Sequence, residues 1–209
     1  RAACADAAPE PVTTMHLKSE RDLEYLRRSA DLVSRTLAEV AKHVRAGVTT
    51  RELDAVAEDF ILSHNARPAF KGYDPGWGGG KFPGSLCTSV NDVVVHGFPS
   101  DYALRDGDIV SVDCGVLLDG YYGDCAYTFA VGSLSAANRH LCTTTYEALW
   151  KGIEQVQHGG RLGDVAHAVE QHCLANGCGV VRELVGHGIG RELHEAPSVP
   201  NFGRRKSGA

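Results

Sequence analysis

A repeated order of secondary-structure signals constrains the fold of this chain more than any other feature. Each half reads as a long helix, a V-x-x-G turn, a second helix and then strands. Residues 44–47 (VRAG) match residues 156–159 (VQHG) at an offset of 112, and residues 54–56 (DAV) match residues 167–169 (HAV) at 113. Because an internal repeat sets a whole fold, we expect an α+β protein with two pseudo-symmetric halves around one antiparallel sheet.

Capping signals predict four helices. In the first half, an S-x-x-D capping box opens a helix with a continuous apolar stripe over residues 19–47, and a T-x-x-E box opens a shorter helix over residues 49–65. In the second half, the corresponding helices begin at Ser135 and after residues 159–160, and the last one stops at Gly177.

Runs rich in apolar and β-branched residues predict five strands. They are residues 86–90, 93–96, 108–117, 121–131 and 179–185. The first half spans about residues 19–131, so a full second copy would extend to roughly residue 240 to 250. Since the sequence has 209 residues, we expect an incomplete second half that lacks its later C-terminal strands and leaves an open sheet edge.

Two segments read as irregular. Residues 1–14 are rich in Ala, Pro and Thr and predict a disordered extension before a domain over residues 15–209, with Met15 as the natural start or, equally, an ordinary flexible tail. Residues 71–84 (KGYDPGWGGGKFPG) predict a flexible surface loop. The GGK within it is not a phosphate loop, because Pro75 and Phe82 stand where that motif needs Gly and Ser or Thr.

Charge and cysteine content narrow the class of protein. The net charge of -5 gives no basic footprint for nucleic acid. No apolar run has the length of a membrane span. Seven cysteines are scattered singly, without a C-x-x-C pair, which favours free thiols and the cytoplasm over a disulfide framework.

Two aspartates interrupt runs that otherwise read as buried strands. The turn at residues 119–120 makes these runs a hairpin, in which positions whose numbers total 239 face each other. Asp113 then faces Ala126 and Asp124 faces Gly115, which puts both carboxylates on one face as diagonal neighbours.

An ionised carboxylate on an apolar sheet face is costly unless a positive group meets it, and neither run contains Lys or Arg. Three interpretations are open. The two carboxyls share a proton, as in acid dyads; they hold a metal ion between them; or they are unrelated, one facing solvent and one in a turn. The apolar flanks disfavour the third.

Histidines near glycines add candidate chemistry. His187 and His194 lie seven positions apart in VGHGIGRELHEAP, where the glycines permit close backbone approach and do not match a dinucleotide fingerprint. His96 ends the apolar run of NDVVVHGFP, just before a turn, where functional groups are common. The histidines within the predicted helices have no motif around them and read as structural.

These three motifs, NDVVVHGFP, the aspartate pair and GHGIGRELHE, occur together in the order found in type I methionine aminopeptidases. With the helix–VxxG–helix opening and the duplication, the chain resembles that family from about residue 15 to its end. The resemblance implies the pita-bread fold, a centre of two divalent metal ions, and removal of the initiator methionine from nascent chains whose second residue is small.

Carried over by motif position, the resemblance makes Asp113, Asp124 and His187 metal ligands, with Asp124 bridging both ions. It places His96 and His194 against the amine side and the scissile peptide of the substrate, where they would hydrogen-bond the peptide and stabilise developing charge. Carboxylates with one imidazole suit Co, Mn, Fe or Zn, among which the sequence does not choose.

The resemblance also assigns a substrate pocket. Tyr73, Phe82 and Cys87 match the lining of the methionine pocket, an apolar slot suited to a thioether. Residues 74–81 are longer than the usual link between the pocket aromatics.

A second departure concerns two glutamates that the family supplies from later strands. In the family, one of them is a metal ligand and the general base, and the other bridges both metal ions. Glu192 and Glu195 do not occupy those motif positions. The chain thus carries three of five expected protein ligands, and we expect little or no peptidase activity from it alone.

Two alternatives stay open. A proline-directed aminopeptidase or prolidase shares HGIG and the aspartate pair but usually carries an extra N-terminal domain. A non-catalytic pita-bread protein that binds peptide would not need the two glutamates. The partners implied are nascent N-termini that begin with Met and a small residue, with the ribosome as a further candidate, for a monomer that uses neither a nucleic acid sequence nor a membrane.

Overall fold

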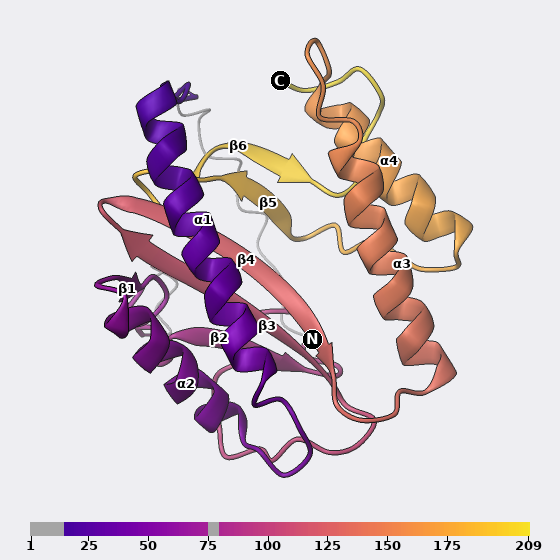
Figure 1. Cartoon of the computed structure of the whole chain (residues 1–209). Coiled ribbons are helices and arrows are strands. Elements are labelled where there is room, and N and C mark those ends of the chain that lie inside the picture. The colour runs from indigo at the N-terminus through magenta and orange to yellow at the C-terminus, as the bar shows by residue number, and fades with distance from the viewer. Residues whose placement is uncertain (1–14, 75–79) are drawn as a thin grey trace.

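The computed structural model describes residues 15–74 and 80–209 (Figure 1). The predicted disorder of residues 1–14 therefore lies outside the described residues. The elements follow one another as α1 (Glu20–Ala41), α2 (Thr50–Ser63), β1 (Arg67–Pro68), β2 (Leu86–Val90), β3 (Ile109–Leu118), β4 (Tyr121–Ala130), α3 (Ala136–Ile153), α4 (Leu162–Ala175), β5 (Val185–Gly188) and β6 (Glu195–Pro200).

Both predicted capping boxes of the first half are present. The Ser19 hydroxyl accepts the backbone N–H of Asp22 while the Asp22 carboxylate accepts the Ser19 N–H, and Thr49 and Glu52 repeat this arrangement at α2. These contacts satisfy N–H groups that a helix cannot pair internally, so the starts of α1 and α2 are fixed by local sequence.

The predicted hairpin register is confirmed. β3 pairs antiparallel with β4, with Asp113 opposite Ala126 and Gly115 opposite Asp124. Asp119 and Gly120 both have positive φ, 51° and 81°, as a two-residue hairpin turn of right-handed strands requires. On its other edge β3 pairs with β2 and, further along, with β1.

The main core lies between this sheet and the first helix pair. α1 packs on β3 and β4, and α2 packs on α1, β1 and β2. Fully buried side chains at the centre include Val33, Leu53, Leu86, Val112 and Val116. The sheet therefore has one face covered by helices, and the other face remains for the side chains of Asp113 and Asp124.

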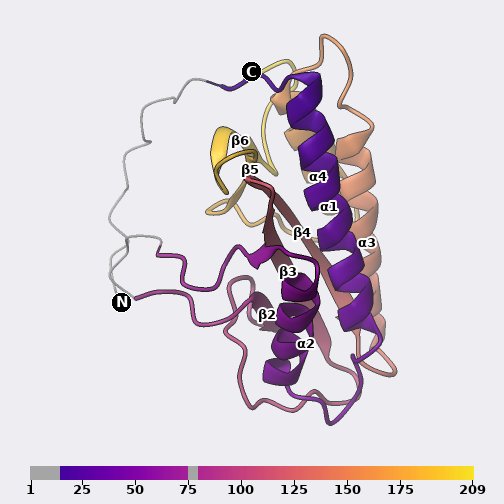
Figure 2. The same ribbon diagram turned by 60° about the vertical axis from the view of Figure 1, so that its left-hand side comes forward.

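The second half is built differently. α3 and α4 pack on each other, and β5 and β6 form a separate two-stranded antiparallel sheet that contacts α4. Figure 2 shows α1, α3 and α4 on the same side of the strands. No helix among the described residues is long and apolar enough to cross a bilayer.

Two of the predicted strands are wrong. Residues 93–96 form an exposed turn between Asn91 and His96, which both have positive φ, 51° and 58°. Here the backbone folds back, and Thr88 N–H donates to Gly97 O at 2.8 Å. Apolar β-branched residues alone do not form a strand without a partner to pair with.

Residues 179–184 are also irregular, and the strand of this region, β5, starts only at Val185. Its partner β6 pairs with Val185 and the three residues after it. Pairing with β6 thus sets where β5 lies, and the sequence signals for β6 and for the two-residue β1 were missed.

Candidate metal centre

The β3–β4 hairpin puts the side chains of the two aspartates on one face of the sheet, as diagonal neighbours. Burial, and then the charge of Asp124, raises the pKa of Asp113 to about 8. Burial also raises the pKa of Asp124, against the opposing effects of Asp113 and of His187. The third sequence interpretation, two unrelated aspartates, is therefore wrong.

His187 on β5 faces this pair. Its Nε2 lies 3.6 Å from Oδ2 of Asp124, and its Nδ1 lies 2.9 Å from the carbonyl oxygen of Gly188. A carbonyl can only accept, so Nδ1 carries a proton and donates it to Gly188, and Nε2 is the ring nitrogen directed toward the carboxylates. The second half thus contributes a nitrogen donor to a site whose carboxylates come from the first half.

Contacts across the two halves hold this arrangement. Tyr122 N–H on β4 donates to Gly190 O at 2.8 Å, and Lys18 pairs with Glu195. A Cβ on Gly190 would lie 2.4 Å from Oε1 of Glu195, so a larger residue there would have to displace the ends of the Glu195 and Lys18 side chains. Glu195 is engaged with Lys18, in agreement with the inference that it does not replace a missing metal ligand.

Two more histidines gather beside the pair. The ring of His194 lies 4.3 Å from that of His187, centroid to centroid, and its Nδ1 is 3.2 Å from the Tyr73 hydroxyl. Burial lowers the pKa of His194, and the neighbouring His187 and His96 lower it further. His96 is exposed on the turn over residues 91–96. Asp124, His187 and His194 thus lie close together, and His96 acts on this group only through its effect on the pKa of His194.

The predicted pocket residues divide into two groups. Cys87 lies opposite Asp113 on β2 and packs with Phe82, whose ring stands edge-on to Phe98 at 5.1 Å. Burial, and then Asp113, raises the pKa of the Cys87 thiol, which keeps it neutral and apolar. Tyr73 instead contacts His194.

Sequence reasoning missed two residues of this apolar cluster. Phe70 and Leu193 are buried against Cys87, and a Cβ on Gly115 would lie 2.7 Å from the Phe70 ring. Leu193 stands directly before His194 in the GRELHE motif, and that position was the available signal. Phe70 gave none, because only the fold of residues 65–74 brings it to β3.

The donor set fits a divalent cation. Across residues 15–74 and 80–209, no three His, Cys, Asp or Glu side chains converge closely enough to form a preassembled metal site. Two partly buried carboxylates, with the Nε2 of an imidazole facing one of them, are nevertheless the donors that such an ion takes. A cation between the carboxylates would also offset the cost of burying their charges.

Comparison with known proteins is consistent with this geometry. The sequence profile of metallopeptidase family M24 matches residues 24–208. A methionine aminopeptidase of Clostridium acetobutylicum is 48% identical over 189 residues, which cover 90% of this chain and 73% of that protein.

Solved structures confirm the predicted pita-bread fold. The crystal structure of methionine aminopeptidase from Rickettsia prowazekii superposes with a TM-score of 0.89 at 40% identity, covering 94% of this chain and 77% of that one. Prolidase from Pyrococcus furiosus superposes with a TM-score of 0.77 at 22% identity, covering 90% and 52%. At that identity the likeness to prolidase concerns the fold alone.

Proposed function

The chain belongs to metallopeptidase family M24, and from this premise we propose that it is a metal-dependent aminopeptidase that removes N-terminal methionine from nascent proteins. Its relatives at 40–49% identity over most of the chain bear the name methionine aminopeptidase. The observation that carries the proposal is the placement of Asp113 and Asp124 on one sheet face, with His187 Nε2 3.6 Å from the Asp124 carboxylate, beside an apolar cluster.

Asp113, Asp124 and His187 would hold the metal, with Asp124 the candidate bridge between two ions. The ions, Co, Mn, Fe or Zn, would supply an activated water and polarise the scissile carbonyl. The chain's contribution is to keep the carboxylates close in a buried site and to direct the His187 Nε2 at them, through the bond from Nδ1 to Gly188 O.

His194 and His96 would orient the peptide. Since burial and His187 lower the pKa of His194, its ring is neutral at pH 7 and can donate a hydrogen bond to a peptide oxygen without carrying charge. The Tyr73 hydroxyl at its Nδ1 fixes the ring's orientation. His96, on an exposed turn, would reach the substrate's amine end.

The apolar cluster would select methionine. Cys87, Phe70, Leu193 and Phe82 form a surface without charge, on which a flexible thioether gains contact with aromatic rings and sulfur. It borders the carboxylates directly, because Cys87 and Asp113 are paired across β2 and β3. The proposed enzyme acts as a monomer in the cytoplasm, on chains that are leaving the ribosome.

Methionine release tests the activity. We expect the purified chain with added Mn or Co to prefer release of methionine from Met-Ala-Ser over cleavage of an Ala-Pro peptide. Cleavage of the Ala-Pro peptide in preference to Met-Ala-Ser would overturn the proposal.

Metal binding tests the site. Asp124→Ala should abolish binding of Mn or Co in calorimetry, whereas Asp101→Ala, at an exposed position paired with Arg51, should bind as the unmodified chain does. Unchanged metal stoichiometry in Asp124→Ala would contradict the ligand assignment.

A further inference from the structure

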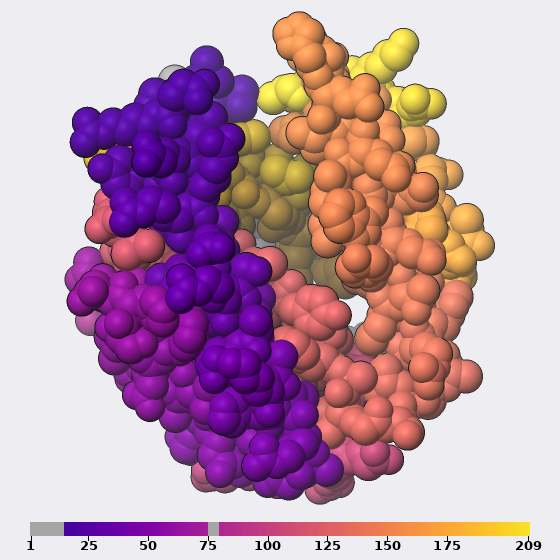
Figure 3. All heavy atoms as spheres, viewed as in Figure 1, coloured from indigo at the N-terminus to yellow at the C-terminus, as the bar shows by residue number. Residues whose placement is uncertain are grey.

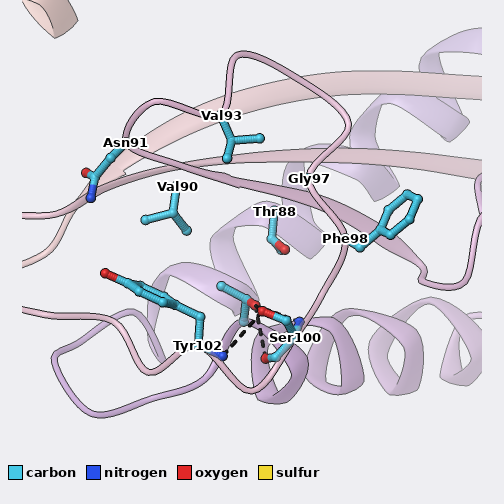
Figure 4. Close-up of a pocket in the computed structure, with 9 residues that line it drawn as sticks. Thr88, Val90, Asn91, Val93, Gly97, Phe98, Ser100 and Tyr102 are labelled. Atoms are coloured by element: carbon cyan, nitrogen blue, oxygen red, sulfur yellow. Dashed lines mark hydrogen bonds between the residues drawn. The ribbon is translucent and has the colours of Figure 1, made fainter.

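A second candidate site lies on the opposite face of the sheet from the carboxylates. A cavity of about 310 Å³ opens between the first turn of α2, β2 and the segment 91–102. Figure 4 shows its lining: Thr50, Thr88, Val90, Asn91, Val93, Gly97, Phe98, Ser100 and Tyr102. Because side chains alternate along a strand, Thr88 and Val90 point away from Cys87 and the metal centre.

Thr88 is the unusual member of this lining. It is 4% exposed, and its hydroxyl has no hydrogen-bond partner among the described residues. Its neighbours on the same face of β2, Leu86 and Val90, belong to the apolar core, where a valine would have the same shape as threonine without an unpaired hydroxyl. Leaving a buried hydroxyl unpaired is unfavourable, and Figure 4 shows that it is directed into the cavity.

The other polar groups of the lining are already paired. Thr50 hydroxyl donates to Ser100 O at 3.1 Å and accepts Ser100 N–H at 2.9 Å. The Tyr102 hydroxyl and the Asn91 amide both donate to Asp108. Among these lining groups, the Thr88 hydroxyl is the one without a hydrogen-bond partner in the described residues.

The rest of the cavity is apolar and uncharged. None of the nine lining residues carries a formal charge, which disfavours an ionic ligand because its charge would be desolvated without a partner. Val93 and Phe98 are 47% and 61% exposed and form an apolar wall at the mouth. A cavity of roughly 150 Å³ already holds a benzene ring, so this volume suits a ring with a short substituent.

We propose that this cavity binds a small uncharged molecule with an apolar body, such as a single ring, and one hydroxyl or amide group that pairs with the Thr88 hydroxyl. The ligand would lie against Gly97 and Phe98, directly after His96. The site therefore takes a chemical class of ligand different from the peptides of the metal centre, and its occupancy does not depend on metal.

The test uses benzyl alcohol and toluene as probes. Each is titrated into the protein, and NMR of the backbone amides detects its binding. Benzyl alcohol should shift the amides of Thr88 and Gly97 and bind more tightly than toluene. Thr88→Val should weaken benzyl alcohol binding about tenfold, the effect of one lost hydrogen bond, and leave toluene binding unchanged. Thr36→Val is the matched control, since Thr36 is equally buried but its hydroxyl donates to Leu32 O at 2.8 Å.

Three results would overturn the proposal. They are no saturable shift of these amides with benzyl alcohol, equal affinity of the unmodified chain for the two probes, and equal benzyl alcohol affinity of Thr88→Val and the unmodified chain. The first of these, with a higher Tm for Thr88→Val, would mean that the hydroxyl is merely buried. If Thr88→Val does not fold, the affinities of the unmodified chain for the two probes still test the proposal.

Discussion

The two helix pairs have the same order of elements but bury their apolar side chains very differently. α1 buries Leu32, Val33, Leu37 and Val40 among others, whereas the residues that α3 buries are Thr144, Ala148 and Gly152. The large apolar side chains of α3 are between 45% and 56% exposed: Leu141, Tyr146, Leu149, Trp150 and Ile153. Figure 3 shows the surface hollowed between α1 and α3.

The difference comes from what each pair packs on. α1 and α2 lie on the sheet of β1–β4, while α3 lies on α4, and β5–β6 contact α4. Capping and periodicity thus specify a helix in both halves, but only a sheet partner buries an apolar stripe. The candidate metal centre lies between the two halves, with carboxylates from the well-packed half and His187 and His194 from the other.

The test with the largest expected effect replaces one leucine in each half. Leu53 in α2 is 0% exposed and Leu149 in α3 is 56% exposed. Leu53→Ala should lower the free energy of unfolding by about 2–5 kcal/mol, while Leu149→Ala should change it by less than about 0.5 kcal/mol. Urea denaturation followed by circular dichroism measures both. Equal losses would show that the halves contribute alike to stability.

A second test uses pH. Because the pKa of Asp113 in the folded state is about 8 and its ordinary value is 3.8, the folded state keeps a proton that the unfolded state has lost between these values. The stability present below about pH 4 is therefore lost as pH rises through about 8, on the order of a few kcal/mol. Asp113→Asn, always neutral, should lack this loss.

The measurement is the free energy of unfolding in metal-free buffer from pH 4 to 9 for both proteins. Asp101→Asn is the control, because Asp101 is exposed and paired with Arg51. Parallel pH curves for the unmodified chain and Asp113→Asn would contradict the buried pair. Added Mn should reduce the loss in the unmodified chain alone.

The smallest expected effect concerns the contact between the halves. Lys18→Ala removes the ion pair with Glu195, whose side chain is only 10% exposed. It should lower the free energy of unfolding by about 1–3 kcal/mol, because a largely buried carboxylate loses its partner. Its larger effect should be faster hydrogen exchange of Glu192 N–H, which bonds to the Glu195 carboxylate. Lys42→Ala, which breaks an exposed pair with Glu39, should leave that exchange rate unchanged.

Local signals predicted well what local contacts decide. The caps at Ser19 and Thr49 and the hairpin turn at residues 119–120 each depend on neighbours within a few positions. The sequence could therefore predict that Asp113 and Asp124 lie on one face of the hairpin. The strand predictions for residues 93–96 and 179–184 were wrong because strand pairing depends on a distant partner. Phe70 could not be predicted as part of the site because only tertiary packing brings it to β3.

The two-residue turn of the hairpin also limits how the gene can change. Side chains alternate along β4, so inserting or deleting one codon between Gly120 and Asp124 would turn the aspartate to the face that carries Gly123. At Gly123 a Cβ would already lie 2.7 Å from the backbone of Ser29. Either change would thus remove a candidate ligand, and a deletion, which moves the aspartate to the position of Gly123, would also push a carboxylate into α1. This hairpin can accept substitutions at many positions, but it cannot accept a change in its length.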